Sequence, residues 1–205
     1  MITILYISVL QPTTMKKILI ILSVIILSYT SYSQEDKNSV EGFIIENNGV
    51  VYKKVFELPN QSETELKKNI LSFISKVPNV SNVKIVGDEI FGDISNLKVN
   101  YKKYGGSYMS TLILLNHSMF GKLIVQTKEN KYRILIKDIY FIDDVSLLSW
   151  NTKKEMDNRT DFTYFITKNG RSEFRSGNTI NKGLGYMNSY FTELFSYSNT
   201  PKENW

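Results

Sequence analysis

The sequence predicts an α+β domain in which an antiparallel sheet, with the order strand, helix, strands, helix, carries its helices on one face. Three observations support this class. Residues 121–142 have the pattern of two paired strands, residues 62–77 carry an amphipathic helical pattern after a capping serine, and residues 181–197 carry a second helical stripe. A content of 42% hydrophobic and 22% charged residues is typical of a globular protein with its own core.

The segment from Gly121 to Ile142 predicts a hairpin that turns at Glu129 and Asn130. In this register matching strand formers face each other, namely Thr127 and Tyr132, Val125 and Ile134, and Leu123 and Ile136. A slip of one residue would set a valine against an arginine and exchange the buried and exposed faces. The alternation is lost late in the second strand. Either a bulge near Lys137 and Asp138 or burial of both faces of the strand would explain this loss.

The first 33 residues have the pattern of a secretory signal peptide. They contain no acid and only two bases, Lys16 and Lys17, which precede the apolar run from Ile18 to Leu27. Small serines follow, and we expect cleavage before Gln34, which would lower the net charge of +5 by the two lysines. The apolar run is shorter than the roughly 20 residues that a membrane span needs.

Two interpretations of residues 1–14 stay open: translation that begins at Met15, or a longer uncleaved anchor. Residues 34–48 are polar, and we expect a flexible leader there. A single domain should follow over residues 49–197, before a frayed tail at 198–205. The chain has no cysteine, so its core must stabilise it without disulfides.

Residues 49–58 alternate and predict the first strand, which Pro59 ends. One face of this strand consists of Val50, Tyr52, Phe56 and Leu58. Ser62 and Glu65 then fit a capping box at the start of a helix that ends before Pro78. The helix has one apolar stripe, formed by Leu66, Ile70, Phe73, Ile74 and Val77. Because the cost of ordering the helix exceeds what this stripe contributes, the helix must lie on a sheet.

Residues 83–101 predict two more strands around a turn at Gly87 and Asp88. Their inward residues should include Ile94, Leu97, Val99 and Tyr101. The glycines within residues 102–107 indicate a loop. The apolar run at residues 108–115 fits a strand or a helix, and we interpret it as a strand.

Residues 149–160 are polar and predict an excursion from the sheet. After it, the dipeptide Asn169–Gly170 predicts a two-residue hairpin turn that sets Phe165 opposite Phe174. The last expected element is a helix over residues 181–197 that covers the sheet. Its aromatic stripe consists of Tyr186, Met187, Tyr190, Phe191, Leu194 and Phe195.

With this order of elements, the chain resembles a family of exported bacterial proteins described as a domain of unknown function with a TBP-like fold. The likeness is carried by VVYKKVFELP at 50–59, the helix at 62–77, KIVGDEIFGDIS at 84–95 and LIVQTKENKYRILIKDI at 123–139. It covers about residues 50–144, and the chain departs from it at 96–119 and 149–180. The resemblance implies the fold and export, and it implies no catalytic or binding residues.

Few residues of this sequence suit catalysis. His117 is the only histidine, so any serine triad would have to use it, and no G-x-S-x-G motif is present. Without cysteine a structural zinc site of the usual kind is excluded. A surface or loop histidine is the simpler interpretation of His117.

Two further groups of residues admit a binding role. Acids cluster at Asp88, Glu89 and Asp93, and again at Asp143 and Asp144. They could hold a hard cation, but turns favour aspartate in any case and no EF-hand spacing is present, so we expect no metal site and no cofactor. Residues 101–104 interleave tyrosine with lysine, yet the basic excess is too slight to predict nucleic-acid binding.

The sequence therefore favours an exported, non-catalytic binding or structural module in the bacterial periplasm or outside the cell, with no assigned catalytic residues. Its expected partner is an envelope protein or peptide, with no nucleic acid and no membrane span after signal cleavage. The alternative is an envelope hydrolase of glycan or peptide that uses Asp138, Asp143 or Asp144 near the end of the hairpin. Two carboxylates converging in a cleft would favour the hydrolase, and carboxylates dispersed over turns would favour the module.

Overall fold

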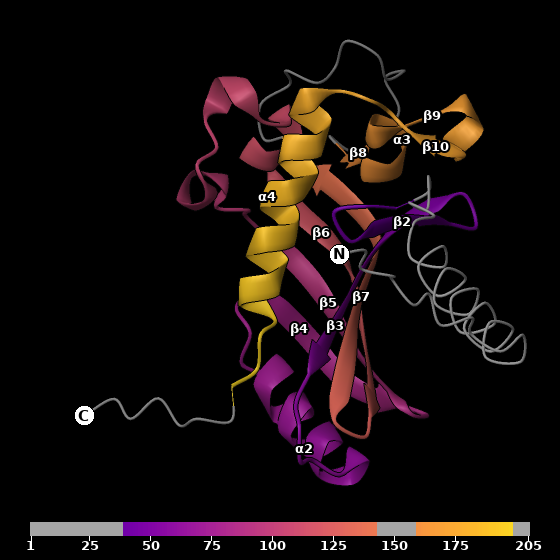
Figure 1. Cartoon of the computed structure of the whole chain (residues 1–205), viewed down its shortest axis with the longest axis vertical. Helices are drawn as coiled ribbons and strands as arrows, with labels where there is room; N and C mark the ends of the chain where they lie inside the picture. Colours follow the sequence, from indigo (N-terminus) through magenta and orange to yellow (C-terminus); the bar gives the residue numbers. More distant parts are fainter. Residues whose placement is uncertain (1–38, 143–158, 199–205) are drawn as a thin grey trace, which may run out of the picture. The chain divides into compact units, whose positions relative to one another are not determined.

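The structure is a computed structural model that describes residues 39–142 and 159–198 (Figure 1). The expected signal peptide at 1–33, the alternative start at Met15 and the last residues of the tail lie outside the described residues. Asp143 and Asp144 lie outside them as well. Within residues 39–142 and 159–198, no helix combines the length and the apolar character needed to cross a membrane.

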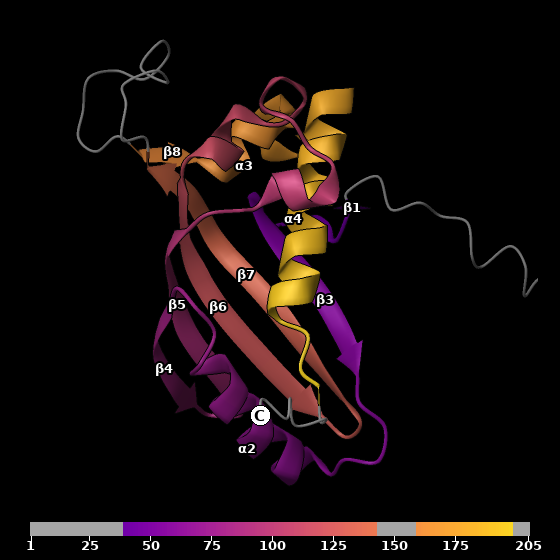
Figure 2. The same ribbon diagram turned by 90° about the vertical axis from the view of Figure 1, so that its left-hand side faces the viewer.

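The described residues form one eight-stranded antiparallel sheet with the order β1-β2-β3-β7-β6-β5-β4, and β8 pairs with the end of β7. Its strands are β1 (Ser39–Val40), β2 (Phe43–Glu46), β3 (Gly49–Glu57), β4 (Val80–Val86), β5 (Glu89–Leu97), β6 (Ser118–Lys128), β7 (Lys131–Ile142) and β8 (Arg159–Asp161). Two helices, α2 (Glu63–Ile74) and α4 (Asn178–Leu194), lie on one face of this sheet (Figure 2). The predicted α+β class is confirmed.

The β6–β7 hairpin has the register that the sequence predicts. Thr127 pairs with Tyr132, Val125 with Ile134 and Leu123 with Ile136. The register then shifts between Phe120 and Lys122, where Asp138 of the facing strand has a φ of 51°. The expected bulge near Lys137 and Asp138 is therefore present. Gly121 lies opposite the bulge, where an added Cβ would come within 3.1 Å of the Lys137 carbonyl oxygen.

Both helices pack the stripes that the sequence predicts against the core, although Phe73, Tyr186, Tyr190 and Leu194 are only partly buried. Ser62 caps α2, because its Oγ accepts a hydrogen bond from the Glu65 backbone N–H at 3.4 Å. Helix α4 begins at Asn178, three residues before the expected start. The two helices and the sheet share one core, to which they contribute Leu66, Ile70, Ile74, Leu184, Met187 and Phe191 from the helices and Tyr52, Leu123, Val125, Ile134 and Ile136 from the strands.

The prediction of a flexible leader at 34–48 is wrong for its second half. Strand β2 pairs with β3, and its Phe43 is fully buried. The hairpin turns at Asn47 and Asn48, whose φ values of 49° and 60° are the left-handed values that a tight hairpin turn needs. Asparagine tolerates this conformation, so the folded domain begins near β1 and not at Gly49.

The prediction of a strand at residues 108–115 is also wrong. This run forms two short 3₁₀ helices, η2 (Tyr108–Ser110) and η3 (Ile113–Asn116), after a third, η1 (Tyr101–Tyr104). Leu112, Leu114 and Leu115 are buried, whereas Met109 is 89% exposed. Burial thus falls on one side of irregular turns and does not follow the two-residue period of a strand.

The hairpin predicted at Asn169–Gly170 is present in a shorter form and another register. Strands β9 (Thr167–Lys168) and β10 (Glu173–Phe174) pair Phe174 with Thr167, not with Phe165. The loop is a turn of 3₁₀ helix, η4 (Asn169–Arg171), and the residues before β9 form the short helix α3 (Phe162–Ile166). Asp161 caps α3 by accepting the Tyr164 backbone N–H at 3.1 Å.

Strand β4 is one outer strand of the sheet, and a bulge interrupts it. Its register against β5 shifts between Ser81 and Lys84, and Asn82 there has a φ of 52°. Beyond the bulge Ile85 and Val86 are 46% and 52% exposed. The outer strand at the opposite side of the sheet is β1, which has two residues within the described part of the chain.

Candidate functional site

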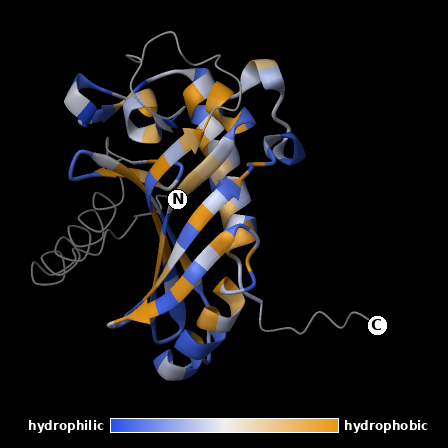
Figure 3. Ribbon diagram, turned by 180° about the vertical axis from the view of Figure 1, so that it is seen from behind, coloured by the Kyte–Doolittle hydropathy of each residue, from blue (hydrophilic) through white to orange (hydrophobic). Residues whose placement is uncertain are grey.

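The face of the sheet opposite to α2 and α4, termed here the open face, carries the side chains that alternate with the core residues. Figure 3 shows the molecule from behind, with hydrophobic and hydrophilic residues alternating along the strands. On the open face, side chains of neighbouring strands stand side by side without α2 or α4 over them (Figure 2).

One row across the open face is internally paired. Gln126 of β6 lies between Glu89 of β5 and Arg133 of β7 in the strand register. Its side-chain amide donates to the Glu89 carboxylate, and its carbonyl oxygen accepts from the Arg133 guanidinium, whose Nε lies at 2.7 Å. The Gln126 amide therefore links the two charged side chains across the row.

A second row carries an ion pair and an uncompensated lysine. Lys122 of β6 donates to Asp93 of β5 at 2.7 Å, and the Asn82 amide donates to the other Asp93 oxygen at 2.8 Å. The hydrogen bond from Lys122, followed by that from Asn82, lowers the pKa of the Asp93 carboxyl, which therefore stays ionised. Lys137 of β7 lies directly across from Lys122, and the described residues offer it no acidic partner.

The third feature is a stack of two aromatic rings and a guanidinium. Phe120 and Tyr140 pair across β6 and β7 just beyond the bulge, with ring centroids 5.2 Å apart and planes 11° from parallel. The Arg159 guanidinium of β8 lies 3.6 Å from the centroid of the Tyr140 ring. Stacking of this kind holds Arg159 against the sheet while its N–H groups stay able to donate.

The sheet splits where the second row meets the stack. Strand β7 pairs with β3 only as far as Ile136, and with β8 only from Tyr140. Between these points the Val50 backbone N–H of β3 donates to the Thr163 hydroxyl of α3 at 3.0 Å, in a buried hydrogen bond. Helix α3 thus holds β3 and β8 apart, and the bulge at Asp138 lies in the gap.

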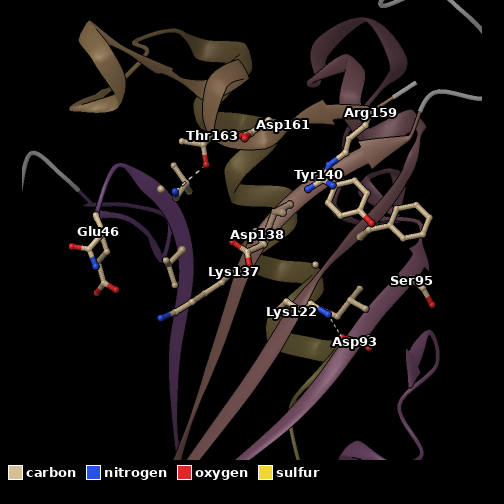
Figure 4. Close-up of a pocket in the computed structure, with 18 of the residues that line it drawn as sticks. Glu46, Asp93, Ser95, Lys122, Lys137, Asp138, Tyr140, Arg159, Asp161 and Thr163 are labelled. Atoms are coloured by element: carbon tan, nitrogen blue, oxygen red, sulfur yellow. Dashed lines mark hydrogen bonds and ion pairs between the residues drawn. The ribbon is translucent and has the colours of Figure 1, made fainter. Parts of the chain in front are cut away.

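A pocket of about 850 Å³ occupies this split, termed here the open-face pocket (Figure 4). The stack forms one part of its wall, and the turn at Asn47 and Asn48 forms another. Its charged lining is balanced between four bases, Lys122, Lys137, Arg159 and Arg171, and four acids, Glu46, Asp93, Asp138 and Asp161. A pocket with an aromatic surface and donors and acceptors of both signs can bind a polar ligand of low net charge.

The structure places the acids named by the sequence in different surroundings. Asp138 lines the open-face pocket, and Asp93 lines it in its ion pair with Lys122. Asp88 is instead fully exposed, 3.6 Å from Lys67, and Glu89 belongs to the row with Gln126. Over residues 39–142 and 159–198, no three His, Cys, Asp or Glu residues are grouped to hold a metal ion.

His117 and the tyrosine–lysine cluster lie away from this pocket. His117 follows η3, is half-buried, and donates its backbone N–H to the Leu114 carbonyl at 3.0 Å. In η1 the hydroxyl of the buried Tyr101 donates to Asn116 at 2.6 Å. Tyr104 and Lys103 both donate to Glu193 of α4. These contacts attach η1 to α4, so the cluster has a packing role here.

Sequence reasoning missed Phe120, Tyr140, Arg159 and Lys137 as site residues. Phe120 and Tyr140 could have been found from the sequence, because they alternate with the core residues along their strands and therefore point away from the core. A large aromatic residue at an outward position is informative where it is followed by a bulge. Arg159 leaves no local signal, because its place beside Tyr140 depends on the return of the chain to β7.

Two solved structures are similar to this chain. One is a TBP-like protein from Parabacteroides distasonis, with 19% identity and a TM-score of 0.47 over 73% of this chain and 92% of that one. The other is a DUF4468 family protein from Bacteroides ovatus, with 12% identity and a TM-score of 0.46 over 82% of this chain and 99% of that one. Their descriptions agree with the resemblance that the sequence indicates, and they name no ligand or activity. No family model and no curated protein matches the chain.

Proposed function

We propose that the protein is an exported, non-catalytic binding module that binds an envelope protein or peptide in the open-face pocket. The observation that carries this proposal is the pocket itself, which combines the stack of Phe120, Tyr140 and Arg159 with a balanced set of acids and bases. A polypeptide presents amide donors and acceptors along with side chains, and such a lining can satisfy both. The signal-peptide pattern ahead of Gln34 supports export.

The alternative of a hydrolase depends on Asp138, the one candidate that lies in the pocket among the described residues. A hydrolase with paired carboxyls needs a second group free to act as acid or base. Asp93 is held in its ion pair, and Asp161 accepts a backbone N–H at the start of α3. Figure 4 shows these three carboxylates, and that of Glu46, in separate parts of the pocket. This dispersion favours binding over hydrolysis.

The test is photo-crosslinking in the native envelope. A photoreactive amino acid replaces Lys137, which lines the pocket, and in the matched control it replaces Lys68, which is exposed on α2. We expect one discrete adduct from position 137 and none from position 68. Phe120→Ala in the position-137 protein should reduce the adduct, because it removes one ring of the stack.

The same preparation distinguishes the alternative. Binding without turnover predicts that the captured partner is recovered intact from the original protein and from the Asp138→Asn variant alike. Equal adducts from positions 137 and 68 would refute the proposal. So would a captured partner that is cleaved by the original protein and left whole by the Asp138→Asn variant. N-terminal sequencing of the exported product should start at Gln34.

A further inference from the structure

A second concave surface adjoins the open-face pocket on the β9–β10 hairpin, and we term it the basic pocket. It has a volume of about 590 Å³ and shares Asn48 and Arg171 with the open-face pocket. Three basic side chains line it, those of Lys168, Arg171 and Arg175, together with the 63% exposed ring of Tyr164. No acid is among its described lining residues. The basic pocket therefore differs from the charge-balanced pocket beside it.

Most of this positive charge is uncompensated. Lys168 lies 3.2 Å from Glu173, and both side chains are about half exposed to solvent. For Arg171 and Arg175 the described part of the chain provides no carboxylate partner. Several uncompensated cations in one concave surface attract anions, and guanidinium groups fit the two oxygens of a carboxylate.

The backbone holds Arg171 at the junction of the two pockets in an unfavourable conformation. Asn169, Gly170 and Arg171 have φ values of 50°, 67° and 73°, so three successive residues are left-handed. Glycine adopts this conformation without penalty and asparagine at a small one, whereas arginine has no local compensation for it. A glycine at position 171 would relieve the strain, yet an arginine is present where its side chain reaches both pockets.

We propose that the basic pocket binds the carboxylates of an acidic peptide segment whose adjoining residues occupy the open-face pocket. The inference rests on the proposed function, because it assigns a charge pattern to the same ligand. The pocket lining gives that pattern: acidic residues beside Arg171 and Arg175, and neutral or basic residues beside Glu46 and Asp138.

A peptide fits this pattern better than a uniformly charged polymer. A nucleic acid or a polyuronate repeats its negative charge at every unit, whereas the open-face pocket balances four bases with four acids and offers a polyanion no net attraction. A peptide changes its charge from one residue to the next, at about 3.3 Å per residue when extended. It can therefore be acidic in one pocket and neutral in the other.

The first experiment compares fluorescent peptides of the sequences EEESSS and QQQSSS with an oligogalacturonate, all titrated into the purified protein. We expect EEESSS to bind about tenfold more tightly than QQQSSS, and added salt to remove the difference. Arg171→Asn with Arg175→Gln should also remove it, because these changes delete charge at positions where the described residues form no hydrogen bond with the side chain. Glu173→Gln should tighten EEESSS about threefold, because it frees Lys168 from its ion pair.

A second measurement tests the strain at Arg171. Arg171→Gly should raise the melting temperature and weaken EEESSS, because it relieves the backbone and removes a cation. Asn60→Gly, the matched control at another left-handed position outside both pockets, should leave EEESSS binding as it was and change the melting temperature little, because asparagine tolerates this conformation.

Four results would overturn the inference: equal binding of EEESSS and QQQSSS, no binding of either at millimolar concentration, tighter binding of the oligogalacturonate, or variants of Arg171 and Arg175 without effect. If the crosslink from position 137 persists in the Arg171→Asn, Arg175→Gln protein with its partner unchanged in amount, the basic pocket is not used and the proposed function stands. If no crosslink forms from position 137, the proposed function itself fails.

Discussion

At the scale of single residues, the packing of α4 depends on a glycine. At Gly183, α4 passes so close to Leu112 that an added Cβ would lie 2.6 Å from the Leu112 Cδ1 atom. Two residues later Gly185 has room, because the nearest atom to an added Cβ is Glu41 Cδ at 3.7 Å. The two glycines are in one helix and differ in what surrounds them.

The pair gives a prediction of opposite sign at two nearby positions. Gly183→Ala should lower the free energy of unfolding by about 1–3 kcal/mol, because the methyl group forces Leu112 out of its packed position. Gly185→Ala should raise it by about 0.5–1 kcal/mol, because alanine favours the helix and meets no obstacle. Chemical denaturation measures both. Equal effects of the two substitutions would contradict the packing described for Leu112.

At the scale of elements, Tyr132 joins β7 to the chain that leaves α4. Its hydroxyl donates to the Phe195 carbonyl at 2.6 Å and accepts from the Tyr197 backbone N–H at 2.9 Å. Burial raises the pKa of Tyr132 from 10.0 to about 12. The buried Tyr52, which donates to Asn188 of α4, has its pKa raised to about 12 by burial as well.

These tyrosines predict a loss of stability at alkaline pH. Between pH 10 and about 12 the unfolded chain has released protons that the folded chain keeps, so rising pH favours unfolding. The free energy of unfolding that each protonated, buried tyrosine contributes is fully present below pH 10 and lost by about pH 12. It amounts to about 2–3 kcal/mol for each residue. Thermal unfolding followed across this range should show the decline.

The substitution Tyr132→Phe distinguishes ionisation of the Tyr132 hydroxyl from other causes of unfolding at alkaline pH. At neutral pH it should cost about 1–2 kcal/mol, because the Phe195 carbonyl and the Tyr197 N–H lose their partner. Above pH 10 the decline should become shallower than in the original protein. Tyr108→Phe, at a position 58% exposed, is the control and should leave the curve unchanged. An unaltered decline in Tyr132→Phe would contradict the assignment.

The elements also differ in how far the sequence could predict them, because some depend on contacts between neighbouring residues and others on contacts between distant segments. The β6–β7 hairpin is local: its turn, its alternation and its cross-strand pairs all lie within residues 121–142, so its register could be predicted. The apolar run at 108–115 has no such local constraint. Its conformation follows from what Leu112 and Leu114 bury against, and α4 supplies that surface from far along the chain.

The candidate site could be predicted only in part for the same reason. Asp138 was found because its bulge breaks a local pattern. Arg159 and Arg171 reach the pocket only after the chain returns through β8 and β9, and Glu46 reaches it through a β2 strand that polar neighbours conceal. A pocket at a split in a sheet is lined by segments that are distant in the sequence. Its lining residues are therefore known only once the tertiary structure is known.

At the scale of the whole molecule, the segment before Gly49 belongs to the core. Phe43 of β2 is fully buried, with ring centroids 5.1 Å from Tyr52, 5.6 Å from Phe162 and 6.4 Å from Phe191. These partners come from β3, α3 and α4. One aromatic ring near the start of the domain therefore contacts elements from its beginning, its middle and its end.

A truncation tests this boundary. A chain that begins at Gly49 should be less stable than one that begins at Lys37 by at least about 3–5 kcal/mol, because it loses the Phe43 ring and the β2 ladder. Phe43→Ala in the longer chain is the matched control and should account for most of the loss. Equal melting temperatures for the two chains would restore the boundary at residue 49 that the sequence indicates.

The broken outer strand β4 has a consequence for how these molecules behave when crowded. A second chain that approached β4 would find its hydrogen-bonding groups out of step beyond Ser81. A bulge of this kind hinders the addition of a further strand along β4. The bulge thus protects this outer strand against pairing with a second molecule, even though Ile85 and Val86 are about half exposed.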